Sequence, residues 1–209
     1  MVTAQTAVPP AASAAAGAPA GVRGRAENPP PGRVEVDPLK FSGNGYGFFD
    51  NRLCALQLVE SGLTDATMFL PSGEVVQPTE VLYKHPVLLL RGSFDPVMKV
   101  HLQMLKQARP GFREHLAPED RGREIELCEI SMDNLLRGKG IDPVDFLDRA
   151  DALQSLGKTV LLSRFAEFHR VSAFLNRCTN KPVGILLSIG LLNELFKSKW
   201  SEKLAGGLL

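Results

Sequence analysis

Four short apolar runs, separated by segments with helical periodicity, constrain the fold of this chain more than any other feature. Each run has the length and composition of a buried strand. Alternation of such runs with helical patterns is the signature of βαβ units. It predicts an α/β fold, a Rossmann-like parallel sheet of about four to five strands with helices on both faces. The expected strands are Val87–Arg91, Glu124–Ile130, Thr159–Leu162 and Val183–Leu187.

The helix expected at 143–156 has the clearest signals at both ends. Asp142 is a natural N-cap, Pro143 occupies the first turn, and Gly157 follows the last helical residue. The other connections show apolar residues at helical spacing without equally clear end signals. We expect further helices at about 97–108, 165–177 and 191–199.

The segment before Pro86 mixes a glycine-rich and aromatic loop, a helix and a hairpin. Asp50 can cap a helix over 51–61 that ends at Gly62. Two apolar stretches around Pro71–Gly73 predict a β-hairpin over 67–77, at the edge of the domain or as a small flap. We therefore divide the ordered chain into residues 34–85 and an α/β domain at 86–209.

The first 33 residues are rich in Ala, Pro and Gly and have almost no large apolar side chains. Burial cannot offset the entropy of ordering such a segment, so we expect a disordered tail. Its arginines Arg23, Arg25 and Arg33 also suit an organelle-targeting segment, the alternative to a cytoplasmic protein. The last residues, Gly206–Leu209, are apolar and suggest that more sequence follows.

Charge and cysteine usage exclude several functional classes. With 24 basic and 23 acidic residues the net charge is +1, so no global field attracts nucleic acid or anionic membranes. Cys54, Cys128 and Cys178 lack the spacing of a zinc site or a disulfide framework. No apolar run approaches the roughly 20 residues that a membrane helix needs. We expect a soluble protein without a protein-bound metal, and any anion site must be local.

Ligands of parallel α/β sheets bind in the crevice beyond the carboxyl ends of the strands. Polar residues follow each expected strand of this chain, although Ser and Asp there also serve as ordinary helix caps. The residues that we expect to bind a ligand are Gly92, Ser93, Phe94, Asp95, Ser163, Arg164 and Ser188.

One segment, Gly92-Ser93-Phe94-Asp95-Pro96-Val97-Met98-Lys99-Val100-His101-Leu102, directly follows the first expected strand. It resembles the first signature of the nucleotidyltransferase superfamily, which includes phosphopantetheine adenylyltransferase and the nicotinate and nicotinamide mononucleotide adenylyltransferases. The resemblance implies binding of a nucleotide or small phosphorylated molecule, and adenylyl transfer from ATP, assisted by Mg²⁺, to a mononucleotide or phosphorylated acceptor. His101 would then be catalytic, stabilising charge on the phosphates.

Two positions depart from that signature. Met98 stands where the superfamily has Thr or His, and Val100 stands where it has glycine. The second signature of the superfamily is not found. The alternative is a non-catalytic α/β scaffold or protein-interaction domain, in which Gly92, Asp95 and Pro96 only form the turn and cap of the next helix.

Overall fold

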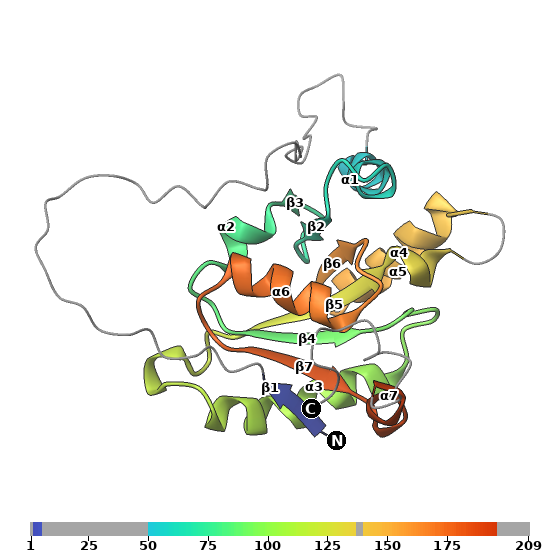
Figure 1. Ribbon diagram of the computed structural model, residues 1–209. Coiled ribbons are helices and arrows are strands. Elements are labelled where there is room, and N and C mark those ends of the chain that lie inside the picture. The colour runs from blue at the N-terminus through green and yellow to red at the C-terminus, as the bar shows by residue number, and fades with distance from the viewer. Residues whose placement is uncertain (1, 6–49, 137–139, 196–209) are drawn as a thin grey trace, which may run out of the picture.

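The computed structural model describes residues 2–5, 50–136 and 140–195 of the chain. Their core is one seven-stranded sheet with the order β1-β7-β4-β5-β6-β2-β3 (Figure 1). Strands β4, β5, β6 and β7 are parallel, whereas β1, β2 and β3 add antiparallel pairings at the edges. The strands are β1 (Val2–Gln5), β2 (Ala66–Phe69), β3 (Val75–Val76), β4 (Val87–Arg91), β5 (Ile125–Ser131), β6 (Thr159–Ser163) and β7 (Val183–Leu187).

The order of the parallel strands is that of a Rossmann-like half. From β4 the chain moves outward to β5 and then β6, and it returns to place β7 on the other side of β4. Because crossover connections are right-handed, helices before and after this reversal cover opposite faces of the sheet. The predicted α/β class with a mainly parallel sheet is confirmed.

Helices cover both faces of the sheet (Figure 1). One face packs against α1, α3, α4 and α5, and the other packs against α2 and α6. The alternation is visible in β4, where Leu88 and Leu90 belong to the first core and Val87 and Leu89 to the second. The helices are α1 (Asn51–Glu60), α2 (Pro78–Leu82), α3 (Lys99–Glu114), α4 (Met132–Leu135), α5 (Pro143–Ser155), α6 (Phe168–Cys178) and α7 (Ile189–Leu195), with a 3-10 turn at Pro118–Asp120.

Capping chemistry places the two best-defined helices where the sequence predicted them. Asp50 accepts a hydrogen bond from the Arg52 backbone N–H at the start of α1, and Asp142 accepts one from Val144 at the start of α5. Gly62 and Gly157 follow these helices with positive φ angles of 74° and 70°. That conformation favours glycine, which explains why both helices end there.

Three helix boundaries differ from the prediction. Helix α3 continues to Glu114 through Pro110, because Phe112 in its last turn is buried against the sheet at Gly184. Helix α6 begins at Phe168 rather than 165, since Arg91 binds the backbone carbonyls of Phe165 and Ala166 in an irregular loop. Helix α7 begins at Ile189, two residues early, and its predicted end near 199 lies outside the described residues.

The predicted hairpin forms and joins the main sheet. Strand β2 pairs antiparallel with both β3 and β6, so the hairpin extends the sheet at its edge. Helix α1 packs on the same core as α3 and α5. Residues 50–85 are thus continuous with the sheet that follows Pro86.

The extreme N-terminus contributes a strand that the sequence did not predict. Val2–Gln5 pairs antiparallel with β7, from Val2 opposite Leu187 to Gln5 opposite Gly184. The rest of the expected disordered tail, 6–33, and most of the aromatic loop, 34–49, lie outside the described residues.

Candidate functional site

The strand order reverses between β4 and β7, so the carboxyl ends of these two strands form a topological switch point, where a ligand crevice is expected in such sheets. The chain leaves β4 toward α3 on one face, while Leu191 and Leu192 of α7 pack on the core of the other face. Such a topological switch point is where open α/β sheets bind their ligands. The segment Gly92–His101 and Ser188 follow these two neighbouring strands.

Phe94 determines the shape of the loop that leaves β4. Its backbone adopts a positive φ of 50°, and its side chain is buried. A Cβ atom on Gly92 would lie only 3.1 Å from Cζ of the Phe94 ring. Glycine at position 92 therefore makes room for the Phe94 ring, whether or not a ligand approaches it.

The turn after this loop differs from the capping arrangement that the sequence suggested. Asp95 and Pro96 are joined by a cis peptide bond and precede the helix, instead of forming its cap and first turn. The N-cap of α3 is Met98, so the helix begins at Lys99. The expectation that Asp95 and Pro96 cap the helix is wrong, because the N-cap position is occupied by Met98, two residues after Pro96.

Arg149 of α5 holds the loop after β4 in place through hydrogen bonds to backbone carbonyls. The side chain is 4% exposed, and its Nη1 donates to the carbonyl oxygens of Ser93 at 3.0 Å and of Asn134 at 3.2 Å. Its Nε and Nη2 bind the carboxylate of Asp145, and Nη2 lies 3.6 Å from Asp95. One buried guanidinium thus connects the loop after β4 and helix α4 to helix α5.

Asn134 adds a second connection between helix α4 and the loop after β4. Its side-chain amide donates to the carbonyl oxygen of Gly92 at 3.2 Å, and the Gly92 N–H donates to the carbonyl of Glu129 at 3.1 Å. The sequence analysis did not select Asn134 or Arg149. The four-residue spacing of Asp145 and Arg149 is compatible with an ion pair on one helix face, but the contacts of Arg149 with the loop depend on tertiary structure.

His101 lies in the first turn of α3, next to this loop. Its Nδ1 accepts a hydrogen bond from the Met98 backbone N–H at 3.1 Å, and its ring packs edge-on against Phe94 with centroids 5.0 Å apart. An accepting Nδ1 assigns the neutral tautomer with its proton on Nε2. Burial lowers the pKa of His101, which favours that neutral form. Nε2 has no hydrogen-bond partner among the described residues, so it retains a donor.

The two departures from the superfamily signature both lie at the surface. The exposed fractions of Met98 and Val100 are 51% and 47%. Neither side chain packs into the protein core. An apolar surface consequently borders His101 where the superfamily signature has a polar residue and glycine.

Ser163 is buried in a network of its own instead of facing the crevice. Its hydroxyl donates to Oε1 of Glu129 at 2.6 Å, and Glu129 also receives Nε and Nη2 of Arg91 at 2.8 and 2.7 Å. Both Ser163 and Glu129 have no exposed surface. This network joins the ends of β4, β5 and β6. The hydroxyl of Ser163 therefore has a structural role.

Arg164 and Ser188 occupy separate ends of the carboxyl edge. Arg164 is exposed beside the end of α1, where its Nη1 lies 3.4 Å from the carbonyl oxygen of Gly62. Because β5 separates β6 from β4, Arg164 follows a strand about 10 Å from β4. Ser188 follows the neighbouring strand, and its Oγ accepts from the N–H of Leu191 at 3.2 Å. Of the predicted site residues, Gly92–Asp95 lie next to His101, and Ser188 follows the neighbouring strand. Ser163 and Arg164 lie apart from this group.

Metal ligands do not converge in the described part of the chain. No group of three or more His, Cys, Asp or Glu side chains there is arranged to hold a metal ion. Asp95 is the exposed carboxylate of the loop. Mg²⁺ in such a site would therefore depend on substrate phosphates and water for most of its ligands.

Among the described helices, none is long and apolar enough to cross a membrane.

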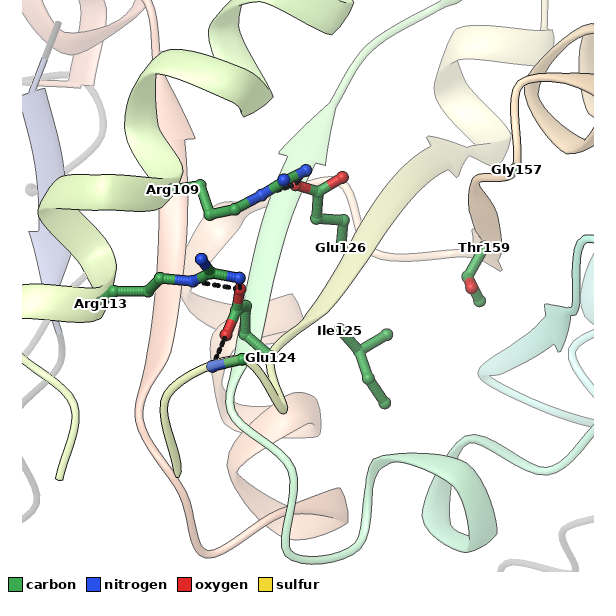
Figure 2. Close-up of a pocket in the computed structure, with 8 residues that line it drawn as sticks. Arg109, Arg113, Glu124, Ile125, Glu126, Gly157 and Thr159 are labelled. Atoms are coloured by element: carbon green, nitrogen blue, oxygen red, sulfur yellow. Dashed lines mark hydrogen bonds and ion pairs between the residues drawn. The ribbon is translucent and has the colours of Figure 1, made fainter. Parts of the chain in front are cut away.

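A second hollow lies at the opposite edge of the sheet, where β5 and β6 begin (Figure 2). This polar cavity has a volume of about 370 Å³. This cavity is not predicted from the sequence, since its charged residues are separated along the chain and lie at the amino ends of strands. Its lining residues are Arg109, Arg113, Gly122, Glu124, Ile125, Glu126, Gly157 and Thr159.

Comparison of this chain with known protein families, curated proteins and solved structures finds no match.

Proposed function

We propose that this protein binds a nucleotide or small phosphorylated molecule at the crevice between β4 and β7, against the loop Gly92–Met98 and the first turn of α3. The observation that carries the proposal is the position of His101. It stands at the N-terminal turn of a long helix, beside a topological switch point, with Nε2 retained as a donor. These are the features that α/β domains use to receive phosphate.

The chemistry of His101 suits a phosphate oxygen. The Met98 N–H donates to Nδ1 of the ring, and the buried Phe94 ring makes an edge contact with the imidazole. A neutral imidazole fixed in this way donates from Nε2 without losing the alignment of the ring. Near this helix terminus, the backbone dipole adds a favourable field for negative charge.

The reaction that we propose for this site is adenylyl transfer from ATP to a phosphorylated acceptor. An oxygen of the acceptor phosphate bonds to the α-phosphorus of ATP, the bond from that phosphorus to the oxygen of the β-phosphate breaks, and pyrophosphate leaves. His101 would donate to phosphate oxygens as charge develops on them, and Mg²⁺, when bound with the nucleotide, would neutralise part of that charge. In this chain the loop contributes rigidity: Arg149 and Asn134 hold its carbonyls, so the ligand meets a preorganised surface.

Calorimetric titration of the full chain with ATP and Mg²⁺ tests the binding step. We expect saturable binding that His101→Ala weakens by about tenfold, the effect of one lost hydrogen bond to a charged group. His115→Ala is the matched control, because His115 caps the other end of α3 and binds the Gly111 carbonyl. Absence of binding in the folded wild type, or equal affinity in the His101 variant, would refute the proposal.

A scaffold without a ligand is the second candidate, and one observation favours it. Gly92 makes room for the Phe94 ring, and Ser163 belongs to a buried network, so these residues have structural roles that need no nucleotide. On this interpretation His101 only caps α3. His101→Ala would then lower thermal stability without changing any heat of nucleotide binding.

A further inference from the structure

The polar cavity at the amino edge of the sheet contains two carboxylates whose oxygens all accept hydrogen bonds. Oε1 of Glu126 binds Nε and Nη2 of Arg109, and Oε2 binds Nζ of Lys158 at 2.6 Å. Oε1 of Glu124 binds Nε and Nη2 of Arg113, and Oε2 accepts from the Gly122 N–H at 2.8 Å. The carboxylates are engaged by the protein itself.

In contrast, each of the two guanidinium groups has N–H donors that bind no partner in the described part of the chain. In both Arg109 and Arg113 the ion pair uses Nε and Nη2, and Nη1 has no partner among the described residues. The two side chains are 38% and 42% exposed, so a ligand can reach them. They leave α3 one turn apart and extend toward β5, as Figure 2 shows.

The charges around the cavity favour an anion. In the lining, Arg109 and Arg113 contribute two positive charges, and Glu124 and Glu126 contribute two negative ones. Lys158, which pairs with Glu126 beside the cavity, adds one further positive charge. Burial tends to raise the pKa of both carboxyls, but hydrogen bonds from their cationic partners outweigh it and lower the pKa. The carboxylates therefore stay ionised at neutral pH, and the ion pairs persist.

We propose that this cavity binds a small oxyanion, the phosphate or carboxylate group of a small molecule, through Nη1 of Arg109 and Nη1 of Arg113. Planar guanidinium groups present N–H donors in the geometry that such oxygens accept. A volume of about 370 Å³ lies at the lower end of the range for small-molecule sites. The site is independent of the proposed nucleotide crevice, which lies at the other edge of the sheet and the other end of α3.

Calorimetric titrations of the full chain at low ionic strength, with inorganic phosphate in one arm and succinate in the other, test this proposal. The key variant is Arg109→Lys/Arg113→Lys, which keeps both positive charges for the glutamates but removes the Nη1 donors. We expect saturable binding of at least one anion to the wild type, weakened about tenfold or more in this variant. The tighter-binding anion identifies the ligand group as phosphate or carboxylate.

Two controls make the outcome specific. Arg123→Lys changes an exposed arginine outside the cavity, 3.8 Å from Asp120, and should leave the affinity unchanged. His101→Ala separates the two sites: binding by Arg109 and Arg113 should persist in this variant, because His101 lies at the other end of α3, whereas any phosphate binding at the nucleotide crevice should be lost. Thermal melting establishes that each variant is folded. Failure of both anions to bind the wild type, or equal affinity in the double variant, would overturn the proposal.

Discussion

The guanidinium of Arg149 donates a 3.0 Å hydrogen bond to the carbonyl oxygen of Ser93, so a side chain of α5 holds the loop that leaves β4. The same Nη1 reaches the carbonyl of Asn134, and the opposite edge of the group binds Asp145. A buried guanidinium in contact with three separate segments orders them together. The proposed nucleotide crevice depends on that order.

Replacing Arg149 by methionine should destabilise the protein and loosen the loop. The change leaves two carbonyl oxygens without their donor, and we expect the free energy of unfolding to fall by about 1–3 kcal/mol. Denaturant unfolding measures this loss, and ATP titration of the folded variant should show weaker binding. Arg170→Met is the control, since Arg170 is exposed and pairs with Glu167 only at 3.8 Å. A comparable loss in both variants would contradict the role assigned to Arg149.

Introducing a methyl group at position 92 should force the Phe94 ring to move. In Gly92→Ala the new Cβ would lie 3.1–3.3 Å from three ring carbons, and overpacking of this kind costs about 1–3 kcal/mol. In the Phe94→Leu background the same substitution should cost less, because the smaller side chain leaves room. A double-mutant cycle measures the difference, and additive effects would show that Phe94 is not the reason for glycine at this position.

Removing the charge of Glu129 should be far more damaging than removing its serine partner. Glu129→Gln leaves the Arg91 guanidinium, 9% exposed, without its counter-ion, and we expect a loss of about 3 kcal/mol. Ser163→Ala removes the hydrogen bond to Glu129 and the longer one, at 3.4 Å, from the Phe165 N–H, and should cost about 1 kcal/mol. Thermal or denaturant unfolding measures both. Similar losses would indicate that the hydroxyl, not the ion pair, maintains the ends of these strands.

Acidification should weaken the start of α3 through His101. Burial lowers its pKa in the folded protein below the ordinary value of 6.5, so the unfolded chain binds the proton more readily. The stability from neutral His101 is complete above that ordinary value and is lost as pH falls through the folded pKa. NMR titration of the ring should show a lower pKa for His101 than for the same residue in the unfolded chain, and His101→Gln should remove this component of the pH dependence of unfolding.

Local sequence signals were sufficient for most of the elements. Strands β4 and β7 have the predicted bounds, and the helices that follow Asp50 and Asp142 begin where these side chains accept backbone hydrogen bonds. Capping and periodicity involve residues that are close along the chain, so they can be recognised without knowing the fold. The start of α3 differs from the prediction, because its N-cap is Met98, whose side chain is not one of the usual capping types.

The sequence by itself determined a mainly parallel α/β sheet and drew attention to the segment Gly92–His101. Only the tertiary structure decided which polar residues share an edge: it brought Arg149 to Ser93, buried Ser163 on Glu129, and assembled Arg109 and Arg113 with Glu126 and Glu124 at the start of β5. Strand-forming patterns extend over a few neighbouring residues, whereas these contacts depend on strand order and on helix packing across the sheet. No local pattern specifies which distant side chain a buried charge will meet.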